Sequence, residues 1–106
     1  MIKDWQKQLN DAADSTKVEV LNRFFKTAPG EYGHGDMFIG ITVPENRKIS
    51  KNYHQASFDV ILEMLRHPVH EFRLAALLAL VEKYKRSKTD TVRDEISRFY
   101  ISICHL

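Results

Sequence analysis

The fold of this 106-residue chain is decided by residues 69–85, whose sequence is VHEFRLAALLALVEKYK. Seven of its residues leave little polar face when the stretch is drawn as a helix: Phe72, Leu74, Ala75, Leu77, Leu78, Leu80 and Val81. A helix that is apolar nearly all round is buried on several sides. We therefore expect a helix over Val69–Lys85 that forms the middle layer of a helical stack.

The segment before this helix predicts another one. Ser57 suits an N-cap position, and the apolar residues that follow recur at helical spacing. His67-Pro68 should end this helix, because the residue before a proline disfavours the α conformation.

The segment after it predicts a last helix. Thr91 and Asp94 have the spacing of a capping box, and the apolar period continues to Leu106. No glycine, proline or basic turn follows as a stop signal. We expect a fold that stops before it is complete, with an exposed apolar face on the last helix through which the chain self-associates.

Three more helices are predicted towards the N-terminus. The first covers Ile2–Ala13, where apolar residues recur at helical spacing. The second opens at Thr16, with Glu19 in capping-box spacing, and ends at Pro29-Gly30. The third covers Pro44–Ala56, since proline suits a first helical position.

Six helices in antiparallel pairs, with roughly 40 residues in each pair, are typical of HEAT-like repeats. The sequence thus predicts an all-α fold: one domain over residues 1–106, built as an α-α superhelix of about six helices and truncated at its end. No repeated motif identifies the repeats, so a compact helical bundle is the alternative architecture.

Composition limits the class of protein. The 16 Lys and Arg residues and the 14 Asp and Glu residues give a net charge of +2, which neither demands nor excludes a nucleic-acid partner. The single cysteine, Cys104, rules out an internal disulfide and favours a reducing compartment. No apolar run is long enough to cross a membrane. We expect a soluble cytoplasmic protein.

Two blocks of sequence carry a resemblance to a known family. The first is Arg23-Phe24-Phe25-Lys26-Thr27 followed by the glycine-rich GEYGHGDMFIGI of residues 30–41, Val43-Pro44 and Arg47. The second is HEFRLAAL at residues 70–77, with Tyr84-Lys85 behind it. Both resemble the DNA alkylation repair family of HEAT-like-repeat glycosylases, in the order that the family has them.

The resemblance implies an activity. Members hold duplex DNA on a concave superhelix and hydrolyse the N-glycosidic bond of purines alkylated at N3 or N7, without a cofactor. An alkylated purine is cationic and leaves without protonation, so the enzyme needs a carboxylate that stabilises the cationic sugar. In relatives an aspartate in a Trp-Asp-x-x-Asp segment does this. Trp5 is the only tryptophan here, so the catalytic residue is expected beyond Leu106, and these residues alone should be inactive.

Four residues are candidates for DNA contact. Arg47, Lys48 and Lys51 cluster on the predicted third helix, where cations suit phosphates. Tyr32, in the glycine-rich segment, is an aromatic that the resemblance would place near DNA. The same cations also suit a helix C-terminus without any ligand. A second cluster surrounds the end of the fifth helix: Lys83, Lys85, Arg86 and Lys88.

Other chemical groups have structural interpretations. Glu31 and Asp36, beside glycines, are expected to bond local backbone amides. His67, His70 and Glu71 lack metalloprotease spacing, and a structural role at a neighbouring helix end is expected for His70 and Glu71. We predict no metal. The alternative function is a non-catalytic HEAT-like module that binds another protein.

Overall fold

The computed structural model of the protein describes residues 1–20 and 37–103. Their elements are α1 (Ile2–Asp11), η1 (Ser15–Lys17), α3 (Val43–Ser50), η2 (Lys51–Tyr53), α4 (Phe58–Leu65), α5 (His70–Arg86) and α6 (Asp90–Ile103). The only β-type pairing among these residues is a single parallel bridge between Met37 and Val69. The predicted all-α class is confirmed, whereas the superhelix of repeats stays a prediction.

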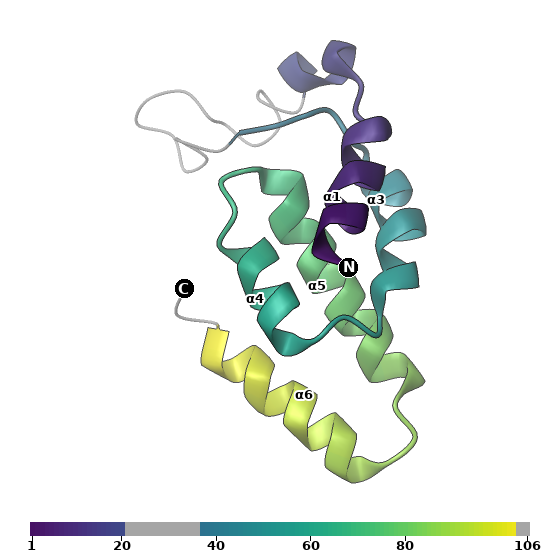
Figure 1. The fold of residues 1–106 in the computed structure, drawn as a ribbon, viewed down its shortest axis with the longest axis vertical. Coiled ribbons are helices and arrows are strands. Elements are labelled where there is room, and N and C mark those ends of the chain that lie inside the picture. Colours follow the sequence, from purple (N-terminus) through teal and green to yellow (C-terminus); the bar gives the residue numbers. More distant parts are fainter. Residues whose placement is uncertain (21–36, 104–106) are drawn as a thin grey trace.

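The long helix α5 lies in the middle of the fold, as its sequence predicts. Figure 1 shows α4 on one side of it, α3 and α1 on the other, and α6 beside its C-terminal half, and α5 packs against α3, α4 and α6. The buried core follows it along its length: Trp5, Leu9, Ile41, Ala56, Ile61, Met64, Val69, Phe72, Ala75, Ala76, Ala79, Leu80 and Ile96.

Burial around α5 is less complete than its composition predicts. Leu77 is 37% exposed and Val81 is 52% exposed, so the expectation that both are buried is wrong. The buried residues of this helix are instead Glu71 and the apolar Phe72, Ala75, Ala76, Ala79 and Leu80. The side of α5 that carries Leu77 and Val81 faces a groove beside α6, which covers it only in part.

The structure shows which of the predicted N-cap residues cap their helices. Ser57 caps α4 as predicted, because its hydroxyl accepts a hydrogen bond from the Val60 amide at 3.3 Å. At the start of α6, however, the Val92 amide donates to Thr89 Oγ1, so the predicted cap at Thr91 is wrong.

At η1 the cap residue is Asp14. Its carboxylate accepts from the amide and the hydroxyl of Thr16, so the side chain that caps this turn belongs to Asp14, two residues before the predicted cap. These two hydrogen bonds lower the pKa of the Asp14 carboxyl, since they stabilise its charged form. The capping box between Thr16 and Glu19 stays a prediction. Residues 18–20 are helical, and the rest of the predicted second helix, to Ala28, lies outside the described residues.

The predicted third helix is shorter in the structure. It ends at Ser50, and the chain continues as the 3-10 turn η2. The Ala56 amide then donates to the Tyr53 carbonyl at 3.0 Å, and Ala56 is fully buried. This turn ends the helical path before Ala56 and leaves Ser57 extended, in the conformation that an N-cap requires.

Candidate nucleic-acid interface

Helix α3 has two faces of opposite character. Its inward side carries Asn46 and Ser50, both fully buried and one helical turn apart. Arg47, Lys48 and Lys51, at the end of α3 and the start of η2, are all exposed. The helix therefore presents its basic residues outward while polar side chains hold it from within.

The inward face of α3 belongs to a chain of buried hydrogen bonds. The Trp5 indole donates to Ser50 Oγ at 3.1 Å, and Ser50 Oγ donates to Asn46 Oδ1 at 2.8 Å. Asn46 Nδ2 in turn donates to the main-chain carbonyl of Glu71 at 2.9 Å. Every link is satisfied, so this chain fixes α3 against both α1 and α5.

The segment that leads into α3, residues 37–42, is called the strap here. It joins the start of α5 through main-chain hydrogen bonds, in which the Met37 carbonyl accepts from the His70 amide at 2.7 Å. The Glu71 carboxylate, only 1% exposed, accepts from the amides of Ile39, Gly40 and Ile41. The structural role predicted for Glu71 is thus confirmed, but its partner is the strap and not a helix end.

Gly40 makes a close approach that only glycine allows. Its φ of +92° is one that L-residues rarely adopt, and a Cβ there would lie 1.9 Å from the Asp14 carbonyl oxygen. The Gly40 carbonyl also accepts from the Asp14 amide at 2.9 Å. The strap is therefore tied both to α5 and to the beginning of η1.

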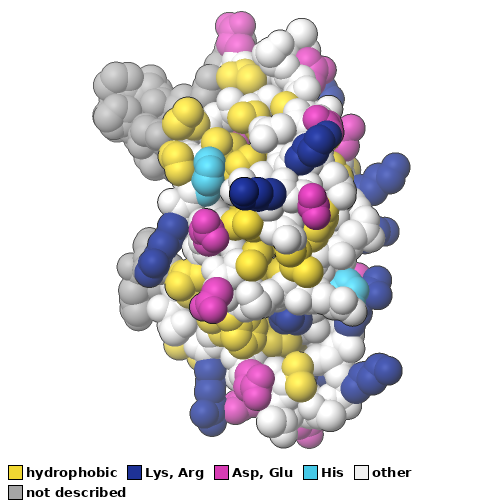
Figure 2. All heavy atoms as spheres, viewed as in Figure 1, with side chains coloured by type: hydrophobic (Ala, Val, Ile, Leu, Met, Phe, Trp, Pro, Cys, Tyr) yellow, Lys and Arg dark blue, Asp and Glu magenta, His cyan; other side chains and the backbone are white. Residues whose placement is uncertain are grey.

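The three cations of α3 are available to a ligand. None of Arg47, Lys48 and Lys51 forms an ion pair with any acidic residue in ranges 1–20 and 37–103. Figure 2 shows Lys and Arg side chains along the edge of the molecule that α3 occupies in Figure 1. The structure thus brings together three of the four predicted DNA-contact residues.

Tyr32, the fourth, lies outside the described residues, and so do Glu31 and Asp36. Their predicted roles stay predictions.

The second basic cluster is less available than the first. Lys83 Nζ lies 5.7 Å from the centre of the Phe58 ring, and Arg86 pairs with Glu82 at 3.3 Å. Lys85 lines an apolar groove. Two of these cations are therefore engaged by neighbours in their own fold, which fits the interpretation of a solvated helix end.

The two histidines before and at the start of α5 take structural positions. His67 Nδ1 accepts from the Val69 amide at 3.1 Å, and its ring packs against Phe72. The His70 ring packs against Phe38, with 4.8 Å between the ring centres. In the described parts of the chain, no three His, Cys, Asp or Glu residues are grouped as metal ligands.

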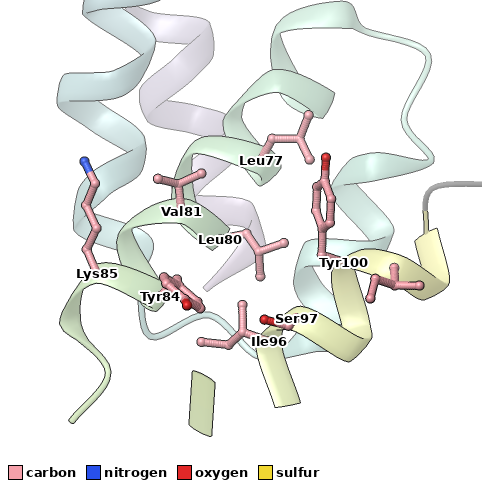
Figure 3. Close-up of a pocket in the computed structure, with 9 residues that line it drawn as sticks. Leu77, Leu80, Val81, Tyr84, Lys85, Ile96, Ser97 and Tyr100 are labelled. Carbon is pink, nitrogen blue, oxygen red and sulfur yellow. The ribbon is translucent and has the colours of Figure 1, made fainter. Parts of the chain in front are cut away.

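An apolar groove of about 730 Å³ lies between α5 and α6, and sequence reasoning did not predict it. Figure 3 shows Leu77 and Val81 of α5 facing Tyr100 of α6 across this groove, with Leu80 and Ile96 at its floor. The sequence signal for this groove was the apolar character of α5 on all sides, because its neighbours do not cover all of its apolar side chains.

Among the described helices, none is both long and apolar enough to cross a membrane.

Comparisons with known proteins place this geometry in context. A family model described as DNA alkylation repair enzyme matches residues 5–103, which span every described helix from Trp5 onward. No curated protein matches the chain. No solved structure matches it either.

Proposed function

Since this chain belongs to the DNA alkylation repair enzyme family, we propose that it serves DNA alkylation repair by holding duplex DNA against the outward face of α3. The proposed reaction is hydrolysis of the N-glycosidic bond of N3- or N7-alkylated purines. These residues supply the DNA-holding surface and its packing, and not the catalytic aspartate. A cytoplasmic location stays part of the proposal.

One observation supports this function above the others. Arg47, Lys48 and Lys51 are exposed, lie within one and a half turns and have no described acidic partner. A fully buried chain of hydrogen bonds holds the opposite face of α3. The backbone that carries these cations is therefore fixed before DNA binds. Preorganised cations lose little freedom on meeting phosphates.

Helix C-termini also favour cations without any ligand, and salt dependence separates the two explanations. We would measure the binding of a labelled duplex over a range of salt concentrations, for the native chain and for the combined variant Arg47→Ala, Lys48→Ala, Lys51→Ala. The logarithm of the affinity should fall linearly with the logarithm of salt, and the slope should become shallower by about 0.9 for each lost phosphate contact.

A matched control carries the same change in charge elsewhere: Lys7→Ala, Arg66→Ala and Arg98→Ala. These residues are also exposed but lie on α1, after α4 and on α6. The control should keep the native slope. Equal slopes for the two triple variants, or no duplex binding by the native chain at low salt, would refute the proposed role of α3.

The catalytic part of the proposal has its own test. These 106 residues, incubated with duplex containing N7-methylguanine, should release free base no faster than buffer alone does. Release clearly faster than the spontaneous loss would contradict the proposal that they supply no catalytic carboxylate.

The groove between α5 and α6 favours a second candidate function, a protein-interaction module that binds a second copy of itself. The face that bears the groove also bears protruding apolar side chains, with Ile101 at 65% exposed and Val81 at 52%. In a two-fold dimer the same patch of both copies meets, so the patch needs a groove and protruding side chains that fit into it. Sedimentation at several concentrations should show a dimer that Ile101→Glu abolishes. A monomer throughout would exclude this function.

A further inference from the structure

We propose that Glu71 is a positioning residue for the DNA-holding face of α3, an inference that rests on the proposed function. Glu71 is buried and cannot itself reach a duplex. It contacts the approach to α3 with its carboxylate and α3 itself with its main-chain carbonyl. Through these two contacts it sets the place and the rotation of the helix that carries the cations.

The carboxylate sets the place at which α3 begins. Its Oε2 accepts from the amides of Gly40 at 2.9 Å and Ile41 at 3.1 Å, and both of its oxygens lie 3.2 Å from the Ile39 amide. Three donors on one buried carboxylate satisfy its charge, and charge-assisted hydrogen bonds are the strong ones. The strap that these amides belong to ends directly before α3, whose N-cap is Thr42.

The main-chain carbonyl of Glu71 sets the rotation of α3. It accepts from Asn46 Nδ2, and Asn46 immediately precedes Arg47. Successive residues of a helix lie about 100° apart around its axis, so an inward Asn46 directs Arg47 and Lys51 to one side of the inward face. If Asn46 turned away from Glu71, the cations would turn with it.

The position of Glu71 in its own helix makes it suited to this task. It lies in the first turn of α5, the central helix of the fold, where the helix dipole favours a negative charge. The Met37–Val69 bridge lies directly beside it and holds the other end of the strap. The strap and α3 are thereby both held against α5, the central helix of the fold.

The test uses Glu71→Gln in the full chain. Glutamine has nearly the same shape, but its amide nitrogen would face amide hydrogens that need an acceptor. We expect the variant to remain helical by circular dichroism, to exchange the amides of Ile39, Gly40 and Ile41 faster, and to bind duplex with a shallower salt slope. The slope should decrease by about one phosphate contact or more.

A control distinguishes positioning from general stability. Ile96→Ala creates a cavity beside α5 and α6, away from α3, and should lower stability without changing the salt slope. If Glu71→Gln does not fold, Glu71→Asp replaces it, since it keeps the charge but shortens the reach to the strap. The same shallower slope is then expected.

The outcomes separate this inference from the function beneath it. Duplex binding by the native chain with an unchanged salt slope in the folded Glu71 variant would overturn the positioning role alone. Absence of duplex binding by the native chain would overturn the proposed function and this role together. A shallower slope in the Glu71 variant and a native slope in Ile96→Ala would support it.

Discussion

The indole of Trp5 donates a hydrogen bond to the hydroxyl of Ser50 across 45 positions of sequence, and both side chains are fully buried. The same indole stacks on Tyr53, with ring centres 5.0 Å apart and planes 5° apart. One side chain of α1 thus holds α3 by a polar contact and η2 by an aromatic one. The basic face of α3 depends on this anchor as well as on Glu71.

Replacement of Ser50 by alanine should destabilise the fold by about 1–3 kcal/mol, because it leaves the Trp5 indole and Asn46 Oδ1 buried without their partner. Urea denaturation followed by circular dichroism would measure the free energy of unfolding. Ser102→Ala is the control, because Ser102 is exposed and bonds only its local helix carbonyl. Equal effects of the two substitutions would contradict the anchor.

Replacement of Gly40 by alanine should cost at least about 1–3 kcal/mol, the range for a residue held in a rarely populated backbone conformation. The clash of its Cβ with the Asp14 carbonyl adds to this cost. The free energy of unfolding measured in urea would test it. If the free energy of unfolding of the variant lies within about 0.5 kcal/mol of the native value, the strap can adopt another backbone conformation at residue 40.

Replacement of Thr89 and Thr91 by alanine should have unequal effects. Loss of the Thr89 hydroxyl, which caps α6, should cost about 1 kcal/mol, the usual loss for an N-cap. Thr91, which is exposed within the helix, should change stability little. Thermal melting of both variants would measure these losses. A larger loss of stability for Thr91→Ala than for Thr89→Ala would show that Thr91 is the N-cap after all.

The stability of the fold should decrease at alkaline pH in a manner that depends on Tyr53. Burial, and then the negative charge of Asp4, raise the pKa of the Tyr53 hydroxyl above its ordinary value of 10.0. The unfolded chain therefore ionises first. The contribution of Tyr53 to stability is fully present below about pH 10 and is lost as the pH rises through the folded pKa.

Tyr53→Phe keeps the ring that stacks on Trp5 and removes the hydroxyl, so its stability should fall less steeply between about pH 9 and pH 11. Urea midpoints at several pH values would measure this. Parallel curves for Tyr53→Phe and the native chain would exclude the effect.

Much of the fold was predictable because helix periodicity is local. The all-α class, the central place of α5 and the Ser57 cap all follow from residues close in sequence, and the structure confirms them. The cap prediction at Thr91 was wrong because Thr89, two residues earlier, offers a competing hydroxyl. Local patterns do not decide between two such groups one or two residues apart.

The candidate site was predictable only in part. The cluster of Arg47, Lys48 and Lys51 is visible in the sequence because the three residues are neighbours, and the family match agrees with the two blocks that resemble it. The groove between α5 and α6 was not predictable, because it depends on how far α6 covers Leu77 and Val81.

The sequence by itself determined the all-α class, the family and the basic cluster, because periodicity, motif order and local charge depend on residues close together in the chain. Only the tertiary structure decided what Glu71 does. Its hydrogen-bond donors lie 25 to 32 positions away, and nothing in HEFRLAAL distinguishes an exposed first-turn glutamate from a buried one whose carboxylate accepts from three amides. A carboxylate finds its partners only when the chain has folded, since burial removes the water that would otherwise satisfy it.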